Sequence, residues 1–312
     1  MELTSLPVLS LADEPAAFSQ AIGESFRTFG FALVKDFDID RGLIDRAWKL
    51  SEAFFALPEA EKRAYHDPVI GGARGYTPFG VEIAKDAKHH DLKEFWHIGR
   101  DLPEGSPLAD ASMPPNVWPA RPDHFQETFT ELYRQFDKTG ATILSRIAVY
   151  LGLDKHWFDP AIEDGNSVMR LLHYPPIENL EGEAIRAGAH GDINLITLLL
   201  GAEEAGLELL FQGKEWIPAN PPEGAMVINV GDMLERLTNH FLPSTIHRVR
   251  NPDPRRAAFS RYSMPFFLHL RSDWPIKTLP QCITADNPDR YPVSITADDF
   301  LQQRLREIGL KK

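Results

Sequence analysis

The sequence predicts an α+β protein with a mainly β core, built as a barrel or a double-sheet jelly roll between helices. Apolar residues recur at helical spacing in several segments of the first 150 residues and again near residue 300. Between residues 167 and 267, short β-rich runs alternate with Gly, Pro and Asn, which is typical of barrels and jelly rolls. No repeat, linker or low-complexity tract divides the chain, so we expect one compact domain over residues 1–312.

The first helix illustrates how the elements are placed. Phe18, Ile22 and Phe26 recur on one face of a predicted helix over Pro15–Phe29, and Gly30 follows as a stop signal. The same patterns predict a buried strand at 31–34, helices at about 41–56 and 122–151, a glycine-rich loop at 71–76, strands at 168–173, 194–200, 207–210, 225–229 and 259–267, and a closing helix at 296–308.

Composition excludes several classes of protein. The formal net charge of −12 argues against a nucleic-acid binder, because phosphate contact needs a concentrated basic face. No apolar run approaches the roughly 18–20 residues of a membrane span, and the first residues lack the basic and apolar regions of a signal peptide. Cys282 is the only cysteine, which fits a reducing compartment. We therefore expect a cytoplasmic protein without nucleic-acid or membrane partners.

A candidate metal site is formed by His190-Gly191-Asp192 and a later histidine, His247. On an extended segment, residues two apart share a face, so His190 and Asp192 can aim an imidazole and a carboxylate at one point. Two histidines and one carboxylate form a facial triad that leaves three positions open on an octahedral iron. A closed zinc site would normally use cysteines, and none lies here. The spacing alone has little specificity, so the flanking sequence decides.

Six further segments carry a family pattern. They are residues 54–58, 59–65, 74–76 (Arg-Gly-Tyr), 91–94 (Asp-Leu-Lys-Glu), 224–232 and 287–292 (Asn-Pro-Asp-Arg-Tyr-Pro). Together with the histidine motif, they resemble the isopenicillin N synthase-like family of iron(II)/2-oxoglutarate-dependent oxygenases over nearly the whole chain.

The resemblance implies a distorted double-stranded β-helix, or jelly roll, flanked by N-terminal helices and a C-terminal helix. It implies an N-terminal helical module at 1–120, a jelly-roll core at 165–275 and a closing helix at 295–310. It also implies that His190, Asp192 and His247 bind Fe(II). Halogenases of the wider superfamily have a small residue in place of this carboxylate, so Asp192 argues against halogenation.

Residues for the co-substrate are expected on two strands. Arg261-Tyr262-Ser263 resembles the family's Arg-x-Ser motif, and Arg261 and Ser263 share a strand face. The planar guanidinium of arginine binds a carboxylate through two parallel hydrogen bonds, which suits the distal end of 2-oxoglutarate. Tyr174 is expected to contact the same carboxylate. Arg170 and Tyr76 are candidate substrate or co-substrate contacts, and segments 71–82 and 93–100 are expected to line the entrance.

The sequence departs from the family at two places. Leu172 replaces an asparagine of the family's Asn-x-Tyr-Pro segment, which leaves the keto-acid end of the co-substrate less defined. The loop between His247 and Arg261 is longer than usual, so Arg255 and Arg256 are alternatives to Arg261.

The predicted function is oxidation of a small molecule, by hydroxylation or desaturation, using Fe(II), O2 and 2-oxoglutarate, with release of succinate and CO2. The alternatives are an oxidase that does not use 2-oxoglutarate, an enzyme that fragments 2-oxoglutarate to ethylene and succinate, and a non-catalytic 2-oxoglutarate-binding or sensing protein. We expect a monomer with a small-molecule substrate that the sequence does not name.

Overall fold

The computed structural model describes residues 5–81, 92–109, 113–176, 186–201, 206–251 and 255–307. The helices are α1 (Pro15–Phe29), α2 (Arg41–Phe55), α3 (Glu59–Arg63), α4 (Phe125–Tyr150), α5 (Asp159–Ile162), α6 (Asp232–Leu237) and α7 (Ala297–Glu307), with a 3-10 turn at Pro280–Cys282. The strands are β1 (Val8–Ser10), β2 (Phe31–Lys35), β3 (Gly75–Thr77), β4 (Glu94–Gly99), β5 (Val168–Tyr174), β6 (Ala187–His190), β7 (Ile196–Leu200), β8 (Leu207–Phe211), β9 (Glu215–Pro218), β10 (Met226–Val230), β11 (His247–Val249), β12 (Arg261–Leu268), β13 (Pro275–Ile276) and β14 (Ile295–Thr296).

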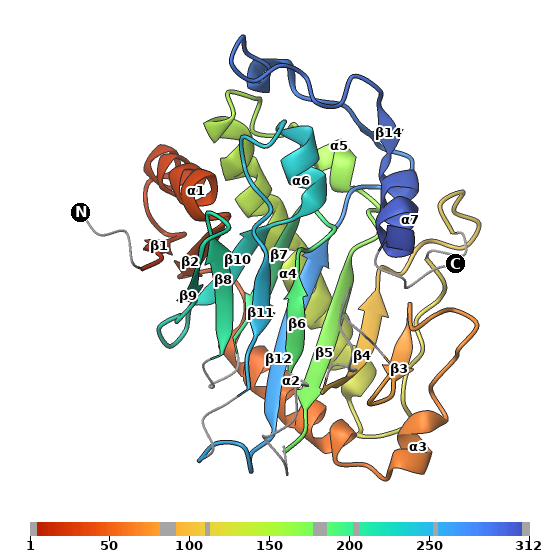
Figure 1. Ribbon diagram of the computed structural model, residues 1–312. Coiled ribbons are helices and arrows are strands. Elements are labelled where there is room, and N and C mark those ends of the chain that lie inside the picture. Colours follow the sequence, from red (N-terminus) through yellow and green to blue (C-terminus); the bar gives the residue numbers. More distant parts are fainter. Residues whose placement is uncertain are drawn as a thin grey trace.

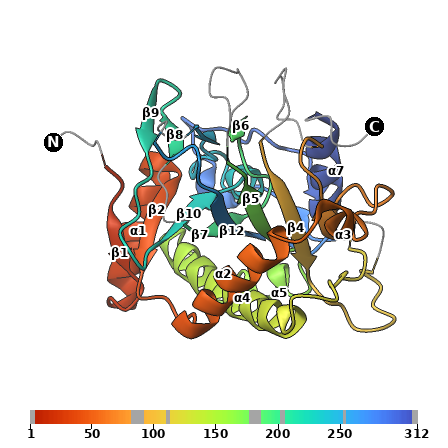
Figure 2. The same cartoon turned by 90° about the horizontal axis from the view of Figure 1, so that it is seen from below.

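The strands form two facing sheets. The larger has the order β1-β2-β10-β7-β12-β5-β4-β3, and the smaller has the order β6-β11-β8-β9. Figure 1 shows the small sheet lying over the middle of the large one. In Figure 2, helices α2 and α4 cover the other face of the large sheet. This is the predicted α+β arrangement, with a double-sheet β core and helices packed outside it.

The first helix is fixed by its two ends. The Glu14 carboxylate accepts hydrogen bonds from the backbone N–H groups of Ala16 and Ala17, at 2.9 and 3.0 Å. At the other end, Gly30 has a φ of 69° and donates its N–H to the carbonyl of Phe26. A side chain at Gly30 would also clash with Thr245, so this turn requires glycine. Strand β2 therefore begins immediately at Phe31.

Two hydrophobic cores lie on opposite faces of the large sheet. In β10, alternate residues Met226, Ile228 and Val230 belong to the core beneath the helices. Val227 belongs to the second core, between the sheets. Because side chains alternate along a strand, Asn229 also faces the space between the sheets. Polar groups on this inner face therefore converge on one interior region.

The elements that were predicted agree closely with the structure in their bounds, and two of them differ for structural reasons. The long helix begins at Phe125 rather than 122, after a residue with left-handed backbone. The predicted glycine loop ends within β3, which pairs Gly75 with His97. The closing helix, predicted to continue to 308, is described only as far as Glu307.

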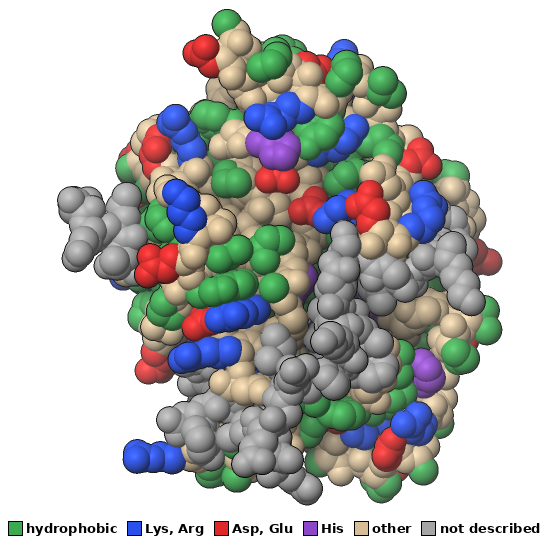
Figure 3. Space-filling view, viewed as in Figure 1, with side chains coloured by type: hydrophobic (Ala, Val, Ile, Leu, Met, Phe, Trp, Pro, Cys, Tyr) green, Lys and Arg blue, Asp and Glu red, His purple; other side chains and the backbone are tan. Residues whose placement is uncertain are grey.

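On the face shown in Figure 3, acidic and basic side chains are interspersed wherever grey atoms do not cover it. Among the described residues, no helix is long and apolar enough to cross a membrane.

Candidate metal centre

The three predicted ligands meet where the small sheet faces the large one. His190 ends β6 and His247 begins β11, and these antiparallel strands place the two histidines directly opposite each other. Asp192 follows β6 by two residues. One ligand atom from each residue lies within 4.8 Å of the others, and His247 Nε2 lies 3.8 Å from Asp192 Oδ1. Two imidazole nitrogens and one carboxylate oxygen are the donor set that suits iron(II) with open coordination positions.

Backbone carbonyls orient both imidazole rings. His190 Nδ1 lies 2.7 Å from the carbonyl of Gly188, and His247 Nδ1 lies 3.2 Å from that of Thr245. Each Nδ1–H donates to its carbonyl, which leaves the Nε2 lone pair for a metal. Desolvation lowers the pKa of His190 to about 4, and the proximity of His247 contributes. The ring is therefore held in the neutral form that a metal requires.

The Asp192 carboxylate is held from the large sheet. Its Oδ2 atom accepts hydrogen bonds from Thr197 Oγ1 at 2.5 Å and Asn229 Nδ2 at 2.8 Å. Burial opposes ionisation, but the two histidines and these hydrogen bonds outweigh it and lower the pKa of Asp192. With Oδ2 engaged, Oδ1 remains directed toward the histidines. Supporting hydrogen bonds of this kind orient metal ligands in many sites.

The triad lies in the wall of a cavity between the sheets. Arg261, Ser263 and Tyr174 line the same cavity, and all three are buried. Arg261 pairs with Tyr174 across β12 and β5, and its guanidinium carbon lies 5.0 Å from the centre of the tyrosine ring. The structure thus brings together the predicted metal ligands and the predicted co-substrate residues.

The alternatives to Arg261 lie elsewhere. Arg255 and Arg256 are exposed, and neither is among the cavity-lining residues that the structure describes. Leu172, which replaces the family asparagine, does line the cavity and stands opposite Ser263.

Comparisons with known families decide the class. The non-haem dioxygenase in morphine synthesis N-terminal family matches residues 6–121, and the 2OG-Fe(II) oxygenase superfamily matches residues 165–270. This chain belongs to the 2OG-Fe(II) oxygenases. The oxygenase is 34% identical over 296 residues to the 2-oxoglutarate-Fe(II) type oxidoreductase hxnY of Emericella nidulans, covering 92% of this chain and 83% of that protein.

Solved structures agree with this assignment. A putative 2OG-Fe(II) oxygenase family protein from Caulobacter crescentus has a TM-score of 0.91 and 56% identity, over 98% of this chain and 99% of that chain. A full-length Neurospora crassa protein in complex with alpha-KG and thymine has a TM-score of 0.85 and 28% identity, over 98% of each chain. These likenesses confirm the double-stranded β-helix and the enzyme class. The oxygenase is a 2-oxoglutarate- and Fe(II)-dependent dioxygenase that acts on a small molecule.

Two residues that support the metal site were missed in the sequence. Thr197 and Asn229 were included in predicted strands, but neither was selected as functional. Asn229 carried a signal, because it is a buried amide within the otherwise apolar run Met226–Val230. A buried polar side chain requires a hydrogen-bond partner. No sequence pattern, however, identified Asp192 as that partner.

Tyr76 is a correction to the expected substrate contacts. It is 1% exposed, its ring packs against that of Phe54, and it pairs with Trp96 across strands β3 and β4. Its side chain therefore lies on the helix side of the large sheet. Its hydroxyl donates a hydrogen bond to Glu94, and it is not among the described residues that line the cavity.

Side chains alternate along a strand, so Lys93 faces the cavity while Glu94 faces away. Of the expected entrance segments, residues 94–99 form a buried strand, and residue 82 lies outside the described residues.

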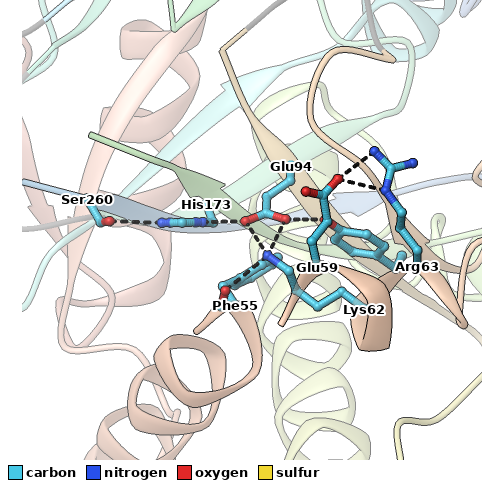
Figure 4. A network of polar contacts seen from close by, with 8 residues as sticks. Phe55, Glu59, Lys62, Arg63, Glu94, His173 and Ser260 are labelled. Atoms are coloured by element: carbon cyan, nitrogen blue, oxygen red, sulfur yellow. Dashed lines mark hydrogen bonds and ion pairs between the residues drawn. The ribbon is translucent and has the colours of Figure 1, made fainter. Parts of the chain in front are cut away.

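Glu94 is the centre of a buried polar network behind the cavity (Figure 4). Its carboxylate accepts hydrogen bonds from Lys62 Nζ, at 2.7 and 2.9 Å, and lies 2.7 Å from His173 Nδ1. His173 Nε2 lies 2.9 Å from Ser260 Oγ. The residues adjacent in sequence to Glu94, His173 and Ser260 are Lys93, Tyr174 and Arg261, which all line the cavity. The network therefore holds three strand ends whose neighbouring side chains form the cavity wall.

We expect Glu94→Gln to lower the free energy of unfolding by about 3–5 kcal/mol, because it leaves the buried Lys62 without a charged partner. The 2-oxoglutarate dissociation constant should also rise, because Tyr174 and Arg261 lose their support. Urea unfolding and 2-oxoglutarate titration measure the two effects. Glu223→Gln is the matched control, since its ion pair with Arg41 is exposed and should be worth about 1 kcal/mol or less. Equal stability of the two variants would contradict the assigned role.

Proposed function

We propose that this oxygenase binds Fe(II) through His190, Asp192 and His247, and anchors the distal carboxylate of 2-oxoglutarate with Arg261, Ser263 and Tyr174. The observation that carries the proposal is the presence of both groups of side chains in the wall of one cavity. Bound iron would supply the redox chemistry: substrate R–H, 2-oxoglutarate and O2 would yield R–OH, succinate and CO2, with desaturation as the other outcome.

The polar side chains have distinct roles in this proposal. The triad would hold the metal, and the cavity that it lines would receive the co-substrate and the substrate. Arg261 is 4% exposed, so a carboxylate that reaches it exchanges water for a charge-assisted, forked interaction in a desolvated site. Ser263, two residues further along the same strand face, adds a hydroxyl donor. The two ends of a dicarboxylate would thus be held by different parts of the cavity.

Apolar side chains form most of the remaining wall. Leu199 and Phe267 come from the large sheet, and Leu207 and Val249 come from the small one. They would exclude water from the reacting atoms and direct a substrate C–H group toward the metal. We also infer that the enzyme is a cytoplasmic monomer; its single cysteine, Cys282, fits a reducing compartment. Light scattering of the purified protein tests the oligomeric state.

Two alternatives stay open for the co-substrate. Leu172 places an apolar side chain where the family has an asparagine, so 2-oxoglutarate could adopt an altered pose that favours its own fragmentation to ethylene. A non-catalytic sensor would need only the binding cavity. The complete triad and the supported Asp192 favour turnover over sensing.

We expect oxidation coupled to a prime substrate, with slow succinate formation when that substrate is absent. The experiment is anaerobic loading with Fe(II) and 2-oxoglutarate, followed by addition of O2 and measurement of succinate and headspace ethylene. A parallel sample of Asp192→Ala is the control and should form neither product. Abundant ethylene without an added substrate would support the fragmentation reaction instead.

A further inference from the structure

The cavity contains a second cationic region, apart from Arg261. Lys93 and Arg170 line it together with Arg261, whereas Asp192 is the one carboxylate among the described lining residues. Lys93 and Arg170 also contact other parts of the chain. Only their place in the cavity wall and their positive charge bear on the proposal below.

Arg170 is held in a fixed orientation. Its Nε–H donates to His97 Nε2 at 2.5 Å, and His97 Nδ1 lies 2.6 Å from the carbonyl of Gly72. These two hydrogen bonds require a neutral His97 that donates through Nδ1 and accepts through Nε2. The guanidinium carbon lies 4.3 Å from the centre of the Phe95 ring and 5.4 Å from that of Phe267. Aromatic contacts of this kind fix the plane of an arginine before any ligand arrives.

Arg170 and Arg261 occupy different parts of the cavity. Arg261 stands opposite Tyr174, which is four residues, or about 13 Å of extended strand, from Arg170. The guanidinium of Arg261 lies over the Tyr174 ring, whereas that of Arg170 lies beside Phe95 and Phe267. One small carboxylate therefore does not explain both arginines.

Arg170 lies level with the metal centre along the strands of the large sheet. Phe267, which contacts its guanidinium, pairs across β12 and β7 with Thr197. Thr197 is the residue that holds Asp192. An anion bound by Arg170 would thus lie level with the metal centre, with the rest of its molecule among the apolar side chains of the cavity.

We propose that the prime substrate is a small organic acid with an apolar body, whose carboxylate is bound by Arg170 with Lys93 nearby. The proposal rests on the proposed function, because it assigns Arg261 to 2-oxoglutarate. A single planar guanidinium in a mainly apolar wall matches the two oxygens of a carboxylate, whereas a phosphate monoester would leave oxygens without donors.

The test compares acids with their neutral amides. The probes are benzoate and benzamide, phenylacetate and phenylacetamide, and hexanoate and hexanamide, with phenyl phosphate as the phosphate arm. Each is added without O2 to enzyme loaded with Fe(II) and saturating 2-oxoglutarate. The visible absorption of the Fe(II)–2-oxoglutarate complex and the melting temperature report binding. At least one acid should perturb the absorption with a dissociation constant ten-fold or more below that of its amide.

Variants separate Arg170 from general charge effects. Arg170→Gln should remove the preference for the acid, and Arg170→Lys should restore part of it. Arg134→Gln is the control, because this arginine lies on the exposed side of α4 in an ion pair with Glu131, and it should leave the preference unchanged. The wild-type comparison of acid and amide stands by itself if Arg170→Gln fails to fold.

Each outcome has a distinct meaning. If the Fe(II)–2-oxoglutarate absorption never forms, the proposed function fails before any acid is added. If it forms and no acid binds more tightly than its amide, or phenyl phosphate binds better than every acid, only the present inference is overturned. If an acid abolishes the absorption instead of shifting it, the acid has displaced 2-oxoglutarate at Arg261, which also overturns the inference.

Discussion

His190→Ala and Asp192→Ala should each purify without iron and form no succinate from 2-oxoglutarate. Each substitution removes one of three ligands whose donor atoms lie within 4.8 Å of one another. No described histidine, cysteine or carboxylate outside the triad completes another cluster of three there. Iron content after anaerobic reconstitution and succinate release after O2 addition measure the two losses.

The ligand variants need a matched control and a graded series. His156→Ala removes an exposed histidine that lies 2.8 Å from Asp159, and it should retain full iron content and activity. Thr197→Val and Asn229→Leu should weaken iron binding about 10–100-fold without abolishing it, because the native side chains orient Asp192 and do not themselves bind the metal. Full iron content in either ligand variant would refute the assigned triad.

The sequence predicted elements well where local signals were strong. The first helix has the predicted bounds because Pro15 begins it, an apolar stripe runs along it and Gly30 ends it. The meeting of His190, Asp192 and His247 could be predicted because His190 and Asp192 are two residues apart, and the flanking sequence resembled a family that supplies His247. In each case the information lay within a short segment or in a familiar motif.

Strand β4 was not predicted, although other strands buried on both faces were. All six residues of β4 are buried, between the helix-side core and the cavity, so the usual alternation of apolar and polar residues is absent. From its sequence, this segment, 93–100, was expected at the entrance rather than in a strand. Glu94 is in fact buried in the network, and His97 holds Arg170.

Pairs that join distant segments were also beyond the sequence. Glu94 meets Lys62 and His173, which are 32 and 79 residues away. Asn229 meets Asp192 across 37 residues. Only the tertiary fold, which packs α3 and the loop after β6 against the large sheet, brings these residues together, and no local periodicity encodes their partners. Tyr76 was misplaced for the same reason, because its face of the sheet depends on the pairing of β3 with β4.

Arg261→Leu should weaken 2-oxoglutarate binding by roughly thirty-fold or more while leaving iron binding nearly unchanged. The estimate is the loss of about 2–5 kcal/mol when a buried charge loses its hydrogen-bonded partner, converted to a dissociation constant. Arg261 is buried in the cavity wall but is not one of the metal ligands, so the two binding events should separate. Anaerobic titration of the iron-loaded variant with 2-oxoglutarate measures the effect.

Arg255→Leu is the decisive comparison, because the long loop before β12 made Arg255 an alternative anchor. Arg255 is exposed and lies outside the described cavity wall, so its loss should change the dissociation constant by less than two-fold. Ser263→Ala should give an intermediate loss, since it removes one neutral hydrogen bond, worth about 0.5–1.5 kcal/mol, beside an intact guanidinium. The order Arg261, Ser263, Arg255 follows from burial and charge together. A variant series in which Arg255→Leu has the largest effect would mean that the co-substrate is held from the loop rather than from β12.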